Sequence, residues 1–331
     1  MTTYIVRRLL WLIPVLFFVS LITFTLMHIA PGGPWDRDPS ARQVDSRTQQ
    51  ILNKKFGLDK PMFLNTAGGN PLDSQFFNYI WNALRGDLGP SYRQRGLDVQ
   101  DILFKPPEGK PFWQSRFGYT ARLGLIALGL AVIIGIPAGI IAALNRNTFV
   151  DYLTLFISTV GVSVPSFVVA IFLIIIFASK LKVIKIVQSD WGNPGAWVMP
   201  ALVLGFSTMA YLTRLTRSSM LEVMQQDYVR TARAKGLSEW MVVGRHMVRN
   251  ALIPVVTILG PALAGLVTGS FIIESMFSFP GSGRAYVQAI SQRDYSMIMA
   301  TTLIYAILVA LANLTVDILY GFLDPRIKVE E

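Results

Sequence analysis

The sequence predicts an all-α integral membrane protein with six transmembrane helices and a large hydrophilic segment between the first two. Apolar residues make up 52% of the 331 residues and charged residues only 15%, whereas a soluble domain carries about 25% charged residues. Six stretches free of Asp, Glu, Lys and Arg are each long enough to cross a bilayer, which takes roughly 20 residues. Backbone groups in lipid must bond within their own segment, so each stretch is expected to be helical.

The expected spans are residues 9–30, 123–144, 152–179, 196–213, 251–273 and 295–316. The first follows Arg7 and Arg8. Its apolar run is longer than the core of a secretory signal, which has about 7–15 residues, so it is interpreted as a retained helix. The third contains Pro165, and a proline inside a span can kink the helix.

Lys and Arg favour one side of the predicted bundle. If the N-terminus is inside, the inner segments hold twelve of them and the short outer loops hold five. Lys180, Lys182 and Lys185 fall outside and oppose the trend without reversing it. Because basic loops stay in the cytoplasm, both termini are expected there.

Two non-membrane segments are large, and they divide the chain into 1–30, 31–118 and a five-helix domain 119–331 that includes an inner loop, 214–250. The outer segment, 31–118, is either a small cap or a mostly irregular loop. It contains one stretch with the spacing of a helical face. The residues of that face are Phe76, Phe77, Ile80 and Leu84.

The inner loop is expected to form a helix–turn–helix. The fourth span continues through Arg214 and Arg217, and Gly236 ends the next helix as a C′ glycine. Ser238 is a plausible N-cap for a second helix. One apolar face of that helix is predicted to hold Trp240, Val243, Met247 and Ala251.

Three functions compete for this loop: a basic helix resting on anionic lipid, a DNA-reading element, and a docking site for a cytoplasmic partner. Two membrane spans pin the loop to the bilayer, which disfavours nucleic acid.

Several chemistries are excluded by the residues themselves. The chain has two His and no Cys, which excludes a disulfide scaffold and a Cys-based zinc or iron–sulfur site. Its single Gly-Lys pair, Gly109-Lys110, is followed by Pro111 and does not form a phosphate-binding loop. Hydrolase motifs are missing as well. No catalytic or metal site is predicted, and energy from ATP would have to come from a partner.

The inner loop resembles the signature loop of ABC-importer permeases, in particular their dipeptide and oligopeptide branch. Residues 227–237 and 249–254 carry the resemblance. Arg230-Thr231-Ala232 stands where the general pattern has Glu-Ala-Ala, and Gly236 is kept. Shorter matches extend over nearly the whole chain, at residues 8–10, 30–32, 56–61, 86–89, 165–167, 280–284, 293–295 and 324–326. Two insertions, 65–74 and 104–115, enlarge the outer face.

The resemblance implies the type I ABC importer permease fold and a subunit that forms half of a pathway for di- or oligopeptides. It implies a second homologous permease, two ATP-binding cassette subunits that hold ATP and Mg, and an external substrate-binding protein. A prokaryotic plasma membrane as the location is implied by the same resemblance. The coupling contact with the ATPase would be made by Tyr228, Thr231, Ala232, Arg233, Ala234, Lys235, Gly236 and Leu237. Relatives of this branch carry nickel chelates, glutathione or sugars, so these solutes remain open.

Glu274, Asp317 and Pro165 are the candidates for the substrate pathway. Glu274 is expected to face the outer vestibule and meet a peptide amino group, with pairing to Arg284 as the alternative. Asp317 lies at the inner end of the sixth span, where it lines the pathway or pairs with a nearby Arg. A stand-alone secondary transporter is a different class of function, which predicts inverted repeats and midplane ions; the sequence shows neither.

Overall fold

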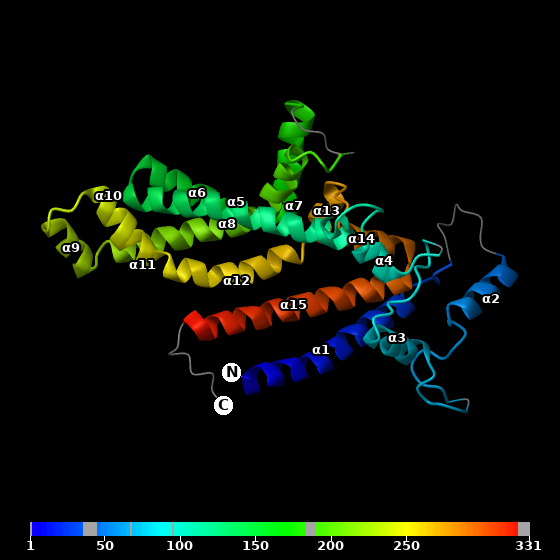
Figure 1. Cartoon of the computed structure of the whole chain (residues 1–331). Helices are drawn as coiled ribbons and strands as arrows, with labels where there is room; N and C mark the ends of the chain where they lie inside the picture. The colour runs from blue at the N-terminus through cyan, green and yellow to red at the C-terminus, as the bar shows by residue number, and fades with distance from the viewer. Residues whose placement is uncertain (1, 36–44, 67, 95, 183–189, 324–331) are drawn as a thin grey trace. The chain divides into compact units, whose positions relative to one another are not determined.

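The computed structural model describes residues 2–35, 45–66, 68–94, 96–182 and 190–323, without the side chains of 2–5 and 316–323. Its regular elements in this part of the chain are helices, beside one isolated antiparallel bridge between Pro90 and Asp98. The predicted all-α class is therefore confirmed. The longest helices in Figure 1 are α1 (Thr2–Ile29), α5 (Arg116–Leu144), α8 (Gly195–Val223) and α15 (Tyr295–Leu323).

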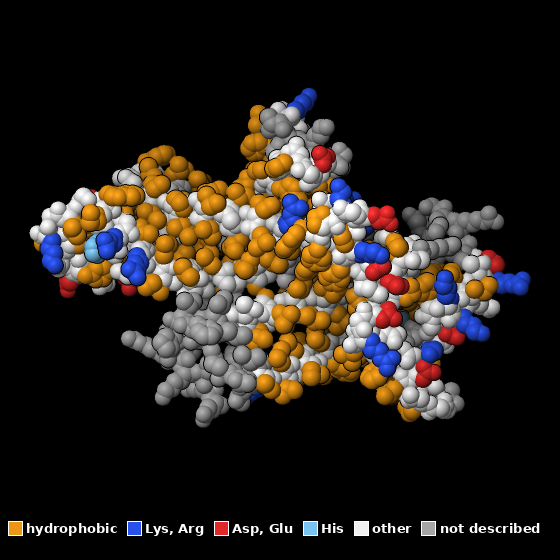
Figure 2. Space-filling view, in the orientation of Figure 1, with side chains coloured by type: hydrophobic (Ala, Val, Ile, Leu, Met, Phe, Trp, Pro, Cys, Tyr) orange, Lys and Arg blue, Asp and Glu red, His pale blue; other side chains and the backbone are white. Residues whose placement is uncertain are grey.

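Four continuous helices among the described residues are long and apolar enough to cross a membrane, and two bent helix pairs bring the number to six. Four of the predicted spans thus correspond to straight helices, the third corresponds to one bent pair, and the fifth corresponds to the second arm of the other pair, Ile253–Val267. Exposed apolar side chains such as Ile133 and Phe156 cover much of these helices, as Figure 2 shows. Such a continuous apolar surface is typical of a face that contacts lipid.

The third predicted span is broken far more sharply than a proline kink. It consists of α6 (Phe149–Ser163) and α7 (Ser166–Leu173), which continues as the π-helix η2 (Ile174–Lys180), and the two parts meet at 114°. Val164 has an extended backbone with ψ 127°, and Pro165 follows with ψ 139°. A residue before proline is kept out of the helical region by steric clash, so the helix ends at Ser163.

The fifth predicted span is shorter than expected because a glycine ends it. The helix α12 covers Ile253–Val267, and Gly269 follows with φ +79°. Ser270 then caps the short helix α13 (Phe271–Met276), where its Oγ accepts from the Ile273 N–H at 3.4 Å. A second break separates α12 from α11 (Arg249–Ala251) with a bend of 49°.

The chain forms two compact units. Unit 1 comprises residues 1–119 and 280–310, and unit 2 comprises residues 120–279 and 311–331. Beside α1 and the start of α15, unit 1 contains α2 (Ser46–Lys55), α3 (Gln75–Leu84), α4 (Val99–Phe104), the 3₁₀ turn η1 (Phe112–Gln114) and α14 (Ser282–Gln292).

Unit 1 has a core that ties part of the segment between the first two spans to its helices. Phe24 of α1, Phe76 of α3 and Met299 of α15 pack in one cluster. The predicted amphipathic helix is therefore present as α3, with Phe76 buried and Leu84 exposed.

In unit 2, α5 approaches α8 closely at two glycines. A Cβ on Gly135 would lie 2.7 Å from the Met209 carbonyl oxygen, and one on Gly139 would lie 2.6 Å from that of Thr213. Small residues allow helix backbones to approach in this way. Gly265 and Gly269 have the same four-residue spacing as Gly135 and Gly139, but a Cβ on Gly265 would meet no heavy atom within 4 Å.

Candidate functional site

The signature loop of the sequence forms three short helical pieces at one end of unit 2 (Figure 1). They are α9 (Asp227–Ala234), α10 (Glu239–Met241) with the π-helix η3 (Val242–Val248), and α11 (Arg249–Ala251). We call residues 227–251 the α9–α11 segment. It connects the end of α8 to the start of α12, so both long helices are attached to it directly.

The turn after α9 confirms the expected role of Gly236. Lys235 caps α9, and Gly236 follows with φ +75°, a conformation that L side chains rarely adopt. No heavy atom lies within 4 Å of a Cβ built on Gly236. The glycine is thus required by its backbone conformation and not by lack of space. Ser238 stands at the N-cap position of α10 as predicted, but its side chain makes no capping hydrogen bond.

The second helix of the segment differs from the predicted helical face. Val242 and Met247 are five residues apart, and both are fully buried, as the five-residue hydrogen-bond spacing of a π-helix requires. Trp240 is 85% exposed and lies outside this buried set. The prediction for Trp240 was wrong because a 3.6-residue period cannot foresee the register shift that a π-helix introduces.

One face of α9 packs inward and the other is exposed. Val229 and Ala232 are buried in a cluster with Met220, Met247 and Ala251. Of the predicted coupling residues, Ala232 is thus an inner packing residue and Leu237 is half-buried. The exposed ones are Tyr228, Thr231, Arg233, Ala234, Lys235 and Gly236. Figure 2 shows Lys and Arg side chains beside apolar ones at this end of the unit.

Two polar contacts brace α9 against the pieces that follow it. Arg233 donates to both carboxylate oxygens of Glu239, at 2.6 and 3.2 Å, across the Gly236 turn. This hydrogen bond raises the pKa of the Arg233 guanidinium above its ordinary value. Asn250 donates from Nδ2 to the Tyr228 hydroxyl at 3.0 Å and so joins α11 to α9. Sequence reasoning missed both contacts, because neither the six-residue separation of Arg233 and Glu239 nor the 22-residue separation of Tyr228 and Asn250 matches a regular helical spacing.

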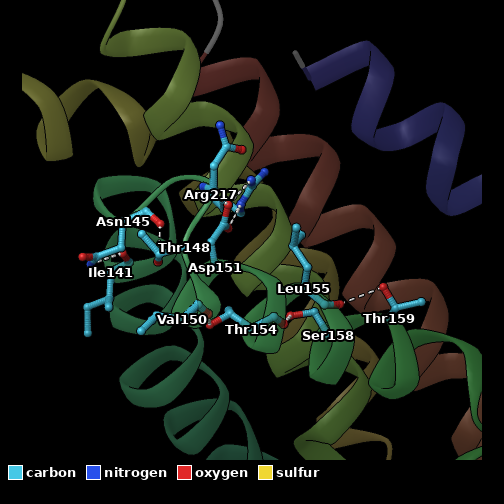
Figure 3. A network of polar contacts seen from close by, with 11 residues as sticks. Ile141, Asn145, Thr148, Val150, Asp151, Thr154, Leu155, Ser158, Thr159 and Arg217 are labelled. Atoms are coloured by element: carbon cyan, nitrogen blue, oxygen red, sulfur yellow. Dashed lines mark hydrogen bonds and ion pairs between the residues drawn. The ribbon is translucent and has the colours of Figure 1, made fainter.

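An ion pair at the start of α6 braces the end of α8 (Figure 3). Arg217 donates from Nε to Asp151 Oδ1 at 2.5 Å and from Nη2 to Oδ2 at 2.8 Å. The backbone N–H of Asn147 donates to the same carboxylate at 3.0 Å. Sequence reasoning missed this pair too, since Asp151 stands one residue before the predicted third span.

The pathway candidates lie elsewhere. Glu274 of α13 is fully buried and accepts a hydrogen bond from Thr120 Oγ1 at 3.0 Å, so its carboxylate is not exposed to a vestibule in this structure. Pro165 is exposed at the start of α7. The backbone at Asp317 belongs to α15, but its side chain is outside the described residues, as are Lys185 and residues 324–326.

These candidates are not brought together with the α9–α11 segment. Ile273 and Phe277 of α13 pack on Met199 and Val203, near the start of α8, whereas α9 follows its end at Val223. Glu274 and the α9–α11 segment therefore lie near opposite ends of α8. That arrangement is suited to passing a movement of the α9–α11 segment along α8.

Comparison with known proteins adds three relatives over essentially the full length. The chain is 37% identical over 331 residues to the dipeptide transport system permease protein DppB of Bacillus subtilis, covering 100% of this chain and 99% of that protein. It is 36% identical to the oligopeptide transport system permease protein OppB of Haemophilus influenzae, covering 99% and 100%. It is 38% identical to the glutathione transport system permease protein GsiC of Escherichia coli K12, covering 99% of each chain.

The fold has a solved counterpart, and a family model matches the chain. A chain of the MetNI methionine ABC transporter in an inward-facing conformation superposes with a TM-score of 0.50 at 18% identity, over 63% of this chain and 94% of that one. The model for the binding-protein-dependent transport system inner membrane component matches residues 135–329. The resemblance drawn from the motifs is thereby confirmed: the chain belongs to the inner membrane permease components of binding-protein-dependent transport systems.

Proposed function

We propose that this protein is a permease subunit of an ATP-driven importer for di- or oligopeptides and forms half of the translocation pathway. The observation that carries the proposal is the full-length similarity to DppB, at 37% identity over 331 residues. GsiC is similar at 38% identity, and this favours glutathione, itself a tripeptide, as a second candidate substrate.

The partners follow from the same proposal. A second homologous permease completes the pathway, an external binding protein delivers the solute, and two ATP-binding cassette subunits hold ATP and Mg. The excess of Lys and Arg on the side of the α9–α11 segment supports a cytoplasmic location for this segment and for both termini.

The α9–α11 segment is the proposed coupling site. Its exposed face offers Tyr228, Thr231 and Arg233 to the ATPase, while the Arg233–Glu239 and Tyr228–Asn250 contacts stiffen the segment. A stiff element transmits the displacement of a bound partner to the helices attached to its two ends, here α8 and α12. Glu274, near the other end of α8, and Pro165, at the start of α7, are proposed pathway residues, and Asp317 completes the set.

The proposal is tested in proteoliposomes that contain the complete transporter. We expect uptake of a radiolabelled dipeptide only when ATP, both ATPase subunits and the binding protein are present. Gly236→Val forces a β-branched residue into positive φ, which costs about 1–3 kcal/mol, so we expect uptake to fall about tenfold or more. Gly236→Asn is the matched control, because Asn tolerates this conformation, and it should keep near-normal uptake.

The level of each variant in the membrane is measured alongside uptake, and we expect it to be unchanged. Uptake by the purified chain alone would contradict the proposal of a partner-driven permease. Normal uptake by the Gly236→Val variant would contradict the coupling role of the α9–α11 segment. Uptake of glutathione in place of dipeptides would assign the second candidate substrate.

A further inference from the structure

Unit 1 contains a cavity that the coupling role leaves unexplained. Its volume is about 370 Å³, and it lies among the C-terminal end of α1, the helix α3 and the start of α15. The loops after α2 and before α4 complete its walls. The volume falls within the range of about 300–1,000 Å³ that small-molecule sites occupy.

A continuous arc of five rings forms one part of the wall. Neighbouring ring centroids along the arc are 4.1, 5.1, 6.0 and 4.5 Å apart. In order, the rings belong to Phe24, His28, Tyr295, Tyr92 and Phe56. Neighbouring rings in the arc are tilted against one another, and together they offer a broad apolar surface to a ligand side chain.

His28 serves as part of this wall rather than as a group that binds a ligand. Its Nδ1 lies 2.8 Å from the Phe24 carbonyl oxygen, and its Nε2 lies 3.2 Å from Gln75 Oε1. The Gln75 amide in turn donates to the carbonyl oxygens of Leu58 and Lys60. These bonds fix both side chains and hold the cavity open between α1 and α3.

The charged side chains at the cavity are two lysines, and the described residues that line it include no Asp or Glu. Lys55 Nζ lies 5.8 Å from the centroid of the Phe56 ring, at one end of the arc. Lys60 pairs with Asp73, which is outside the lining, at 2.6 Å. Lys55 is therefore the cation best placed to meet an anionic group. A ligand ammonium would be repelled by the same charges.

Tyr79 also lines the cavity. The Tyr79 hydroxyl is shielded from solvent and has no hydrogen-bond partner among the described residues. Burial raises the pKa of this phenol above its ordinary value, so it stays a neutral donor at every working pH. A buried hydroxyl without a partner costs free energy, and a polar ligand group offsets this cost. The Asn82 amide, four residues from Asn78 on α3, lines the same cavity.

We propose that this cavity is a binding site for a short peptide with a free C-terminal carboxylate. The carboxylate pairs with Lys55, an apolar side chain of the peptide packs on the ring arc, and the peptide main chain bonds to Tyr79 and Asn82. The assignment rests on the proposed import of peptides and names a site for them outside the coupling segment. Main-chain recognition combined with a non-specific apolar wall suits ligands whose sequences vary.

Equilibrium dialysis of the complete transporter in phosphatidylcholine nanodiscs, without the binding protein, tests the site. The probes are radiolabelled Ala-Phe and its C-terminal amide. A charge-assisted hydrogen bond is roughly twice as strong as a neutral one. We therefore expect the amide, and Ala-Phe on the Lys55→Gln variant, to bind about tenfold more weakly or worse. Tyr79→Phe should weaken Ala-Phe binding several-fold, and because it removes an unpartnered buried hydroxyl it should leave the melting temperature unchanged or raise it.

Lys54→Gln is the matched control. Lys54 precedes Lys55 in the same helix and is exposed, but it does not line the cavity, so binding should be unchanged. Equal binding of peptide and amide, or full binding by Lys55→Gln, would overturn the proposal. Displacement of the peptide by phosphatidylglycerol added to the nanodisc would also overturn it and assign the cavity to a lipid phosphate.

The binding result is separable from the proposed function. Normal ATP-driven dipeptide uptake with no Lys55-dependent binding overturns the cavity site alone. A complete transporter that takes up another solute and no peptide overturns the proposed function, whatever the dialysis shows.

Discussion

Asp151 has only 1% of its side chain exposed, yet it carries a carboxylate. Three donors, two on Arg217 and one on Asn147, satisfy its two oxygens. A charged group in such a place is tolerated only when it is paired and fully hydrogen-bonded. The pair therefore fixes the start of α6 to α8 at Arg217, ten residues before the α9–α11 segment begins.

Arg217→Ala is expected to destabilise the protein, because it leaves the Asp151 carboxylate without two of its donors. Hydrogen bonds to charged groups contribute about 1.5–3 kcal/mol, and a loss of that size should be visible as a lower melting temperature in detergent. The double variant Asp151→Asn with Arg217→Gln should recover part of the loss, since no charge is then left unpaired. Arg214→Ala is the control, an exposed arginine three residues earlier in α8. Equal melting temperatures for the Arg217 and Arg214 variants would show that the ion pair contributes nothing.

At the scale of elements, the break between α12 and α13 is set by a glycine with two separate constraints. Gly269 has φ +79°, and a Cβ there would lie 2.4 Å from Thr120 Cγ2 and 2.6 Å from Glu274 Oε1. Because Gly269 has no side chain, Thr120 at the start of α5 can lie close to it. Thr120 there donates a hydrogen bond to the buried Glu274 carboxylate of α13. In this structure that hydrogen bond joins Glu274 to the start of α5.

Gly269→Ala is expected to destabilise unit 2 by about 1–3 kcal/mol from the backbone conformation alone, and the two close contacts add to that cost. Gly265→Ala is the matched comparison four residues earlier, inside α12 and with no heavy atom within 4 Å. It should be neutral or slightly stabilising, since Ala is favoured over Gly in a helix by up to about 1 kcal/mol. Thermal unfolding of both variants measures the difference. If both unfold like the unaltered protein, the close approach at Gly269 is not needed.

At the scale of the whole molecule, the proposed orientation places the α9–α11 segment in the cytoplasm and α2 on the opposite side of the membrane. The chain has no cysteine, so single cysteines report sidedness without background. Gln50 of α2 and Ser238 beside α10 are both exposed. We expect a membrane-impermeant maleimide to label Gln50→Cys on intact spheroplasts and Ser238→Cys only after permeabilisation.

The reverse labelling pattern would contradict the orientation and with it the coupling role of the α9–α11 segment. Labelling of both positions on intact spheroplasts would show that the second, third and fourth spans do not separate the two sites as proposed. Thr231→Cys provides a second position in the same segment and should behave like Ser238→Cys.

The spans and the Gly236 turn were predictable because each depends on a short window of sequence. Hydropathy over about 20 residues decides whether a helix is stable in lipid, and a glycine after a helical stretch marks its end. The 114° bend at Val164-Pro165 was only partly predictable. Proline excludes helical backbone for the residue before it, but the direction in which α7 leaves is set by its packing on Met199 and Phe277.

The sequence by itself determined the membrane class, the number of spans and the family, because composition and local patterns carry that information. Only the tertiary structure revealed the Asp151–Arg217 pair, the buried Glu274 carboxylate and the cavity beside Tyr79. Their partners lie 66 and 154 residues apart, and the cavity wall joins α1 to α15. Such contacts arise when distant segments exclude lipid and water from one another, and no local pattern records which segments will meet.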